Sequence, residues 1–345
     1  MFEHLAGNEN AKKILTRLIG SGRIPNSLMF SGPDGVGKKH FALEIARSFI
    51  CRQQVETGPC GKCSACLRIG AFTYPDADEK DDHKRIVFTE HPDVGFIIPY
   101  KKNILVDAIR ELEREAFFRP YEARVRVFII EDADKMNDAA SNALLKTLEE
   151  PAATSYIFLI TSRPDAMLKT IHSRCQVVPF ARMDPMEIER FILKTEKVSP
   201  LEAGLVARLS AGSLSRALSM DIEKFRAQRD AMLRVLESVV LGVSRGSLFQ
   251  TAEWMSDAKN KDNFESSLEI LQTLVRDTWM LRLGVTHGSI TNVDIADRLD
   301  NLADRIVTTK LTGWISEIEL LRESLMVNVN KKIAADALFT QMAGL

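Results

Sequence analysis

The sequence predicts an α/β domain with a parallel sheet in its first half and an all-helical region in its second half. In the first half, short apolar runs alternate with helical patterns, and such alternation is typical of a parallel sheet covered by helices on both faces. The runs are residues 27–31, 125–130 and 156–161, and the helical patterns are 39–50, 106–118 and 139–148. From about residue 222, apolar residues recur at helical spacing to the end.

The region between these halves indicates short helices, one of which opens at Asp184-Pro185. The chain has 345 residues and a formal net charge of −1, so no global field directs it to nucleic acid or membrane. No apolar run is long enough for a membrane span, and the polar start MFEHLAGNENAKK does not resemble a secretory signal. We therefore expect a cytoplasmic protein without a membrane partner.

The sequence GPDGVGKKH, which begins at Gly32, indicates a phosphate-binding loop between a strand and a helix. Gly32, Gly35 and Gly37 allow the tight turn that points backbone N–H groups at phosphate, and Lys38 would reach the outer phosphates. The pattern requires Ser or Thr next, to hold Mg²⁺, but Lys39 stands there. Lys39 would repel a metal ion, and could pair with phosphate or point to solvent. These residues leave open whether ATP binds.

The run VRVFIIEDADKM indicates a strand that ends in the carboxylates of a nucleotide-bound metal site. Hydrolytic proteins of this type usually have Asp followed by Glu, whereas this chain has Glu131 followed by Asp132. The exchange moves each carboxylate by about an ångström, which can cost on the order of 100-fold in rate. Together with Lys39, it predicts weak or absent hydrolysis.

Four of the five cysteines lie within residues 51–66, in CRQQVETGPCGKCSAC. Cys51, Cys60, Cys63 and Cys66 have the spacing of a closed tetrahedral thiolate site, so we expect a structural Zn²⁺. An iron–sulfur cluster is the alternative, but no other feature indicates redox chemistry. Cys175 stands apart and is expected to be a small packed residue.

Three motifs together resemble the bacterial clamp-loader subunits of DNA polymerase III, which are AAA+ proteins. They are NALLKTLEEP at 142–151, the four-cysteine module, and Ser173-Arg174-Cys175. The resemblance is close over residues 1 to about 220. Lys38-Lys39 and Glu131-Asp132 are more similar to the delta-prime type than to the gamma/tau motor, which has GKT or GKS and Asp-Glu.

The resemblance implies a RecA-like AAA+ domain at 1–181 that includes the four-cysteine zinc module, a helical lid at 182–221 and a helical collar at 222–345. It implies a hetero-pentameric ring with gamma/tau and delta subunits that acts on a sliding clamp and primed DNA. In this ring Arg174, with Ser173 beside it, would reach the ATP of a neighbouring gamma subunit. Arg216, in a segment that resembles the lid's sensor-2 motif, would face the chain's own nucleotide site.

Two other functions remain open at this point. One is an active, gamma/tau-like motor ATPase of the same loader. The other is a stand-alone AAA+ remodelling protein without a role in replication. Turnover of ATP by the isolated chain separates the first from a non-motor subunit of the polymerase complex. Co-purification with polymerase subunits separates the second.

Overall fold

The computed structural model describes residues 2–22, 24–55, 58–196, 198–242, 245–256, 263–325 and 330–344. These residues form two compact units, one of residues 1–194 and 210–218 and the other of residues 195–209 and 219–345. The lid expected at 182–221 is divided between the two units, so the three-domain boundaries stay a prediction. No helix in the described ranges is long and apolar enough to cross a membrane.

The first unit is built on a six-stranded sheet with the order β2-β3-β4-β5-β1-β6. Only β2 runs antiparallel to its neighbour β3; the other pairs are parallel. The strands are β1 (Ser27–Ser31), β2 (Val87–Phe88), β3 (Val94–Ile97), β4 (Arg126–Ile130), β5 (Ser155–Thr161) and β6 (Gln176–Pro179). The predicted parallel sheet is therefore confirmed, and three of its strands lie where the apolar runs placed them.

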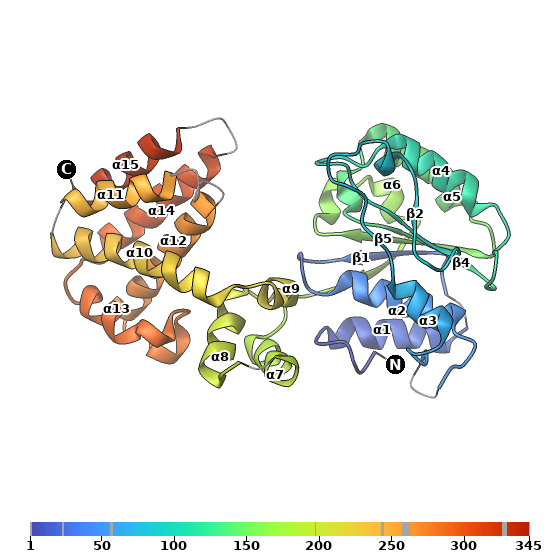
Figure 1. Cartoon of the computed structure of the whole chain (residues 1–345), viewed down its shortest axis with the longest axis horizontal. Helices are drawn as coiled ribbons and strands as arrows, with labels where there is room; N and C mark the ends of the chain where they lie inside the picture. The colour runs from blue at the N-terminus through green and yellow to red at the C-terminus, as the bar shows by residue number, and fades with distance from the viewer. Residues whose placement is uncertain are drawn as a thin grey trace. The chain divides into compact units, whose positions relative to one another are not determined.

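Helices cover both faces of this sheet (Figure 1). One face packs on α1 (Glu9–Gly20) and α2 (Lys38–Ile50), through a buried cluster that includes Phe30, Phe41 and Phe158. The other face packs on α4 (Val106–Ala116) and α5 (Asp138–Glu149). The unit also contains α3 (Ser64–Gly70), α6 (Lys169–His172), most of α7 (Pro185–Thr195), and α9 (Leu214–Leu218). Strands buried on both faces account for the near-continuous apolar runs.

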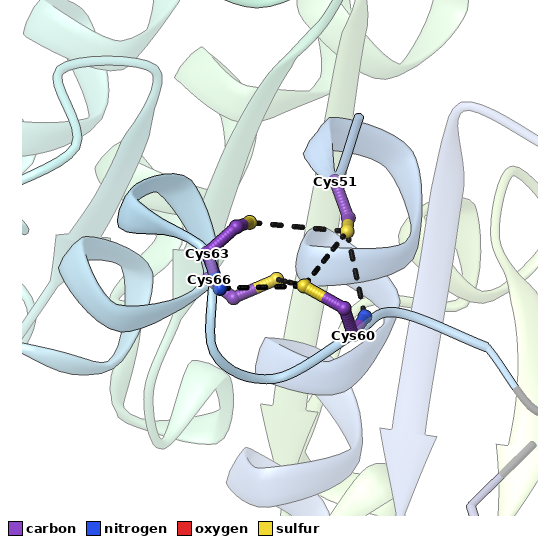
Figure 2. A group of neighbouring side chains, drawn as sticks. All are labelled: Cys51, Cys60, Cys63 and Cys66. Atoms are coloured by element: carbon purple, nitrogen blue, oxygen red, sulfur yellow. Dashed lines mark hydrogen bonds between the residues drawn. The ribbon is translucent and has the colours of Figure 1, made fainter. Parts of the chain in front are cut away.

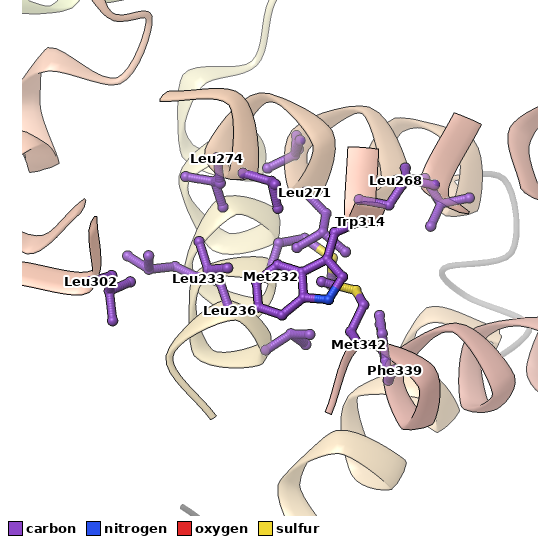
Figure 3. Packing of buried hydrophobic residues seen from close by; sticks show 14 of the residues in the cluster. Met232, Leu233, Leu236, Leu268, Leu271, Leu274, Leu302, Trp314, Phe339 and Met342 are labelled. Carbon is purple, nitrogen blue, oxygen red and sulfur yellow. The ribbon is translucent and has the colours of Figure 1, made fainter. Parts of the chain in front are cut away.

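The second unit is helical in its described residues, as the apolar spacing predicts. Its helices are α8 (Pro200–Leu209), α10 (Ile222–Leu241), α11 (Arg245–Ser256), α12 (Phe264–Arg282), α13 (Ala296–Ala303), α14 (Thr308–Ser324) and α15 (Lys331–Met342). Asp221 caps α10 by accepting the backbone N–H groups of Glu223 and Lys224. Figure 3 shows Trp314 of α14 among Met232 of α10, Leu271 of α12 and Met342 of α15, in one continuous core.

Candidate functional site

Three neighbouring strands, β4, β5 and β1, end at the same edge of the sheet. Because they run parallel, their carboxyl ends bring Glu131, Ser162 and the loop that begins at Gly32 together. The backbone N–H of Gly32 donates to the carbonyl of Thr161 at 3.2 Å, which joins the loop directly to the end of β5. In open α/β sheets, ligands bind at this edge, where the order of the strands changes direction.

The loop itself has the backbone that its glycines predict. Gly35 and Gly37 have φ values of +72° and +95°, in the left-handed region that glycine adopts without strain. A Cβ at Gly32 would overlap the carbonyl oxygen of Phe180, and one at Gly35 would overlap the hydroxyl of Ser213. At Gly37 no atom lies within 4 Å of such a Cβ. Two of the glycines are thus required by close packing, and the third by conformation.

Lys38 is the first residue of α2 and is folded back over the loop. Its Nζ donates to the carbonyl oxygens of Gly32 at 2.5 Å and Pro33 at 2.6 Å, and lies 3.9 Å from Asp34 Oδ1. Burial lowers the pKa of Lys38, against the attraction of Asp34, Asp132 and Asp134. The ammonium therefore donates its hydrogen bonds to the loop's own carbonyl groups.

Lys39 does not point to solvent, which was one of the two sequence expectations for it, and its pairing with phosphate stays a prediction. Its Nζ lies 2.7 Å from Glu131 Oε1 and donates to the hydroxyl oxygen of Tyr74. It also lies 4.3 Å from the ring centroids of Phe72 and Tyr74 and 4.9 Å from that of Phe96. The ammonium is thus enclosed by aromatic rings, which attract cations, and by a carboxylate.

The hydroxyl of Tyr74 completes this group by donating to both carboxylate oxygens of Glu131, at 3.2 and 3.3 Å. Burial and the nearby Glu131 charge raise the pKa of Tyr74, so the hydroxyl keeps its proton. Glu131 is therefore neutralised by Lys39 and hydrogen-bonded by Tyr74. Both of its carboxylate oxygens are thus engaged by other side chains of the same unit.

Asp134 is a member of this site that the sequence reading missed. Its side chain is 2% exposed, and it accepts hydrogen bonds from the hydroxyl of Thr161 at 2.8 Å and from Nε of Arg163 at 3.0 Å. Burial would raise the pKa of Asp134, but the hydrogen bonds from Thr161, Arg163 and Ser162 outweigh it and hold the pKa below its usual value. The hydroxyl at the end of β5 is thereby committed to a neighbouring carboxylate.

Asp132, the other predicted metal-site carboxylate, points elsewhere. Its φ of +47° is left-handed, and its Oδ2 lies 2.8 Å from Nζ of Lys135. The strand-end carboxylates are therefore each paired with a different lysine, Glu131 with Lys39 and Asp132 with Lys135. Both carboxylates therefore lie at the edge of the sheet, but they do not point to one common position.

The four cysteines of the predicted metal module converge (Figure 2). Cys51 follows α2, Cys60 lies in the connecting loop, and Cys63 and Cys66 lie at the start of α3. The four Sγ atoms lie within 4.8 Å of one another, with separations of 3.6 Å for Cys51–Cys60, 3.9 Å for Cys51–Cys63 and 4.0 Å for Cys60–Cys66. Four cysteines in this arrangement can bind a metal ion.

Tetrahedral thiolates at about 2.3 Å from a zinc ion lie roughly 3.8 Å apart, which these separations bracket. Backbone N–H groups of Cys60 and Cys63 donate to the sulfurs of Cys51 and Cys60. The backbone N–H groups of Lys62 and Cys63 lower the pKa of Cys60 to about 6, whereas burial raises the pKa of Cys66. A bound cation would favour the thiolate at all four positions.

Ser173 and Arg174 lie after the short helix α6, on the surface. Nη1 of Arg174 donates to the carbonyl of Thr170 at 2.9 Å and to Oγ of Ser173 at 3.3 Å. Its Nη2 lies 2.5 Å from Oε1 of Glu149, the last residue of α5. Arg174 takes no part in the cluster around Lys39, and its guanidinium remains partly accessible.

Arg216 lies on α9, which packs against the phosphate-binding loop within the first unit. The backbone N–H of Ser215 donates to the carbonyl of Gly35 at 3.0 Å. The helix that carries Arg216 is thus held at the loop, while the sensor-2 assignment of the segment and the role of the side chain stay predictions. Cys175 is half-buried, and burial raises its pKa to about 12.

The chain matches two family descriptions that together cover most of its length. Residues 7–184 match the family described as DNA polymerase III, delta subunit. Residues 223–343 match the family described as DNA polymerase III, delta subunit, C terminal.

Curated relatives agree with these matches. The chain is 29% identical to the DNA polymerase III subunit delta' of Bacillus subtilis (strain 168), over 92% of this chain and 91% of the relative. It is 28% identical to the subunit delta' of Escherichia coli (strain K12), over 91% and 87%. It is 31% identical to the gamma/tau subunit of Mycobacterium tuberculosis (strain ATCC 25618 / H37Rv), but over only 73% of this chain and 42% of the relative.

The solved structures to which the chain is similar include a gamma subunit-related protein from Thermotoga maritima. It is 19% identical, covers 97% of this chain and 99% of its own, and has a TM-score of 0.39. The RuvB branch migration motor of the same organism is 14% identical, covers 86% and 87%, and has a TM-score of 0.40.

Proposed function

We propose a function from one premise: the chain belongs to the DNA polymerase III delta-subunit family, and is a clamp-loader subunit of the delta-prime type. On this premise it is a non-motor member of a ring with gamma/tau and delta subunits. It donates Arg174 to the ATP of a neighbouring gamma subunit and helps to load the sliding clamp onto primed DNA. The helical second unit would serve as the collar of the ring, and the cytoplasm would be the site of action.

The observation that carries this proposal is the contrast between two charged groups of one unit. At the phosphate-binding loop, Lys39 and Glu131 pair with each other at 2.7 Å. At the surface, the guanidinium of Arg174 is held only by groups that leave it partly accessible. The pairing of Lys39 with Glu131 leaves neither position available to a metal ion. The guanidinium of Arg174, in contrast, stays available to another molecule.

The chain's own loop, we propose, hydrolyses no ATP. A metal ion at this loop would need a hydroxyl after Lys38 and a free carboxylate at the end of β4. Lys39 supplies a cation instead of the hydroxyl and neutralises the carboxylate. The hydroxyl of Thr161, which could otherwise orient a water molecule, is bonded to Asp134. The glycine backbone could still accept the phosphates of ATP, but without the chemistry of a motor.

The metal of the four-cysteine module, we propose, is Zn²⁺ in a structural role. The donor set is four sulfurs, and three of their separations, 3.6, 3.9 and 4.0 Å, are close to the roughly 3.8 Å of a zinc tetrahedron. All four protein ligands are filled by cysteine, so no position is left for water or substrate. Zinc would then tie the end of α2 to the start of α3.

A guanidinium supplied from a neighbouring subunit stabilises negative charge that develops on the transferred phosphate. The corresponding test uses a loader reconstituted from gamma, delta and this chain. Arg174→Ala should lower ATP turnover at the site it serves by about 10³ and impair clamp loading. Arg174→Lys should rescue poorly, because an ammonium lacks the planar fork of a guanidinium.

Ring assembly, measured by size-exclusion chromatography, serves as the control. If the Arg174→Ala ring assembles and matches the wild type in both rates, Arg174 is only a surface charge. If the isolated wild-type chain turns over ATP rapidly, the motor alternative replaces the non-motor proposal.

A further inference from the structure

The side chain of Arg174 is held by a partner for which no role has been assigned so far, Glu149. The two residues are 25 positions apart in the sequence, and their side chains meet between the C-terminal end of α5 and the turn after α6. Nη2 of Arg174 lies 2.5 Å from Oε1 of Glu149, so the two side chains form a charge-assisted hydrogen bond. The arginine side chain is 32% exposed and the glutamate side chain 49% exposed.

The contacts of the guanidinium come from two different elements. Nη2 is held by the carboxylate at the end of α5, and Nη1 by the carbonyl of Thr170 in α6 and the hydroxyl of Ser173. A planar group bonded at two of its nitrogens has a defined orientation. An arginine side chain without such contacts samples many rotamers, and that freedom must be lost before the group can act.

We propose that Glu149 is a positioning residue for Arg174, which keeps the guanidinium oriented toward a neighbouring subunit. This inference rests on the proposed function, in which Arg174 acts on the ATP of that neighbour. Surface ion pairs contribute little to folding stability, so a half-exposed carboxylate is suited to orient a cation rather than to stabilise the fold. The guanidinium has five N–H donors, so a carboxylate that uses Nη2 leaves others for phosphate oxygens.

A restraining role predicts the opposite result. If Glu149 held Arg174 away from the neighbour, its removal would raise turnover. If Glu149 only supported the end of α5, its removal would act equally with and without Arg174. These roles are separated by whether removal of Glu149 raises or lowers ATP turnover, and by whether that change in turnover requires Arg174.

The test uses the reconstituted ring with wild type, Glu149→Gln, Arg174→Ala and the double variant. Glu150→Gln is the matched control, because Glu150 is the next residue, is exposed, and forms no ion pair with any described residue. The turnover that depends on Arg174 is taken as the difference between wild type and Arg174→Ala. The kcat and the KM for ATP are measured for each ring, with assembly and Tm checked separately.

We expect Glu149→Gln to lower the Arg174-dependent kcat by about tenfold without changing the KM, because a misoriented finger loses part, but not all, of its effect. In the Arg174→Ala background it should change nothing, and Glu150→Gln should behave as wild type. Glu149→Asp, with its carboxylate drawn back by one methylene, should retain more activity than Glu149→Gln, because it keeps the charge.

Unchanged or increased turnover in Glu149→Gln would overturn the positioning role while leaving Arg174 as the finger. A loss of the same size in the Arg174→Ala background would overturn it as well. If Arg174→Ala itself equals wild type, the proposed function fails, and the positioning role fails with it.

Discussion

Replacement of Lys39 by threonine restores the hydroxyl that the phosphate-loop pattern requires, and we expect this change to produce no ATP hydrolysis. Lys39→Thr leaves Glu131 and Asp132 in exchanged order, and it leaves the hydroxyl of Thr161 bonded to Asp134. It also removes the cation that neutralises Glu131. The main effect should therefore be on stability, not on catalysis.

The size of that effect follows from the geometry of the pair. At 2.7 Å and an effective dielectric constant of about 20, Coulomb's law gives roughly 6 kcal/mol of attraction. Desolvation of both groups offsets most of this. The side chains are 24% and 17% exposed, between surface pairs worth about 0.2–1 kcal/mol and buried pairs whose disruption costs about 3–5 kcal/mol. We expect a coupling free energy of about 2 kcal/mol.

A double-mutant cycle of Lys39→Thr, Glu131→Gln and the double variant isolates this coupling from the contacts of Lys39 with Phe72 and Tyr74. Urea unfolding is followed by circular dichroism. The three tryptophans, Trp254, Trp279 and Trp314, all lie in the helical unit, so their fluorescence reports that unit alone and serves as an internal control. The substitutions should leave the tryptophan-reported midpoint in place.

ATP hydrolysis is measured in parallel, with a gamma/tau subunit as positive control. Turnover by Lys39→Thr above that of wild type would show that Lys39 alone blocks the chemistry. A coupling within about 0.5 kcal/mol of zero, the usual limit of additivity, would show that the ion pair does not hold the site.

Two further predictions concern the metal module and the helical core. Purified protein should contain one zinc per chain. Cys60→Ala should release the zinc and destabilise the segment between α2 and α3, because metal binding contributes folding free energy there. Absence of metal with all four thiols titratable would contradict this prediction. Leu271→Ala, at a fully buried position of α12, should lower the free energy of unfolding by about 2–5 kcal/mol. Leu320→Ala, at a 65% exposed position of α14, should change it by less than about 0.5 kcal/mol. Both free energies are measured by tryptophan fluorescence in urea. Equal costs at the two positions would contradict the packing in Figure 3.

The local sequence pattern was sufficient to predict the strands that are buried on both faces of the sheet. The run at 27–31 predicts β1 at both ends, because its apolar centre at 28–30 is flanked by serines and a glycine follows. The sequence pattern was insufficient to predict β3, because Gly95 interrupts its apolar run. A Cβ at Gly95 would clash with Ile86, so packing requires the glycine, and this packing cannot be seen in the sequence. Similarly, β6 is an edge strand that ends in Pro179, a residue compatible with an edge but typical of a turn.

Helix α4 shows the opposite error. The expected helix continues to residue 118, but α4 ends at Ala116, and Phe117 and Phe118 are exposed. Both rings fit a helical pattern of apolar residues. However, Arg119 precedes Pro120, and a residue before proline is disfavoured in the helical conformation, so the chain leaves the helix here.

Within the candidate site, residue types were predictable and pairings were not. The loop glycines, the four cysteines and the two carboxylates of the β4 end were found from spacing alone. The partner of Lys39 is Glu131, far along the chain, and the cage around it comes from α3–β2 loop residues and β3. The sequence shows Glu149 only as part of the NALLKTLEEP motif, because its contact with Arg174 depends on how α5 and α6 meet.

The pair of Lys39 and Glu131 also bears on how this subunit can evolve. Replacement of Lys39 alone leaves a largely buried carboxylate without its cation, and replacement of Glu131 by aspartate alone draws the carboxylate away from the ammonium of Lys39. Each first step toward a metal site therefore loses stability before any catalytic benefit can be selected. A chain that carries both residues must therefore change both before a metal site can form, so in the ring that we propose, single substitutions would not turn this subunit into a motor.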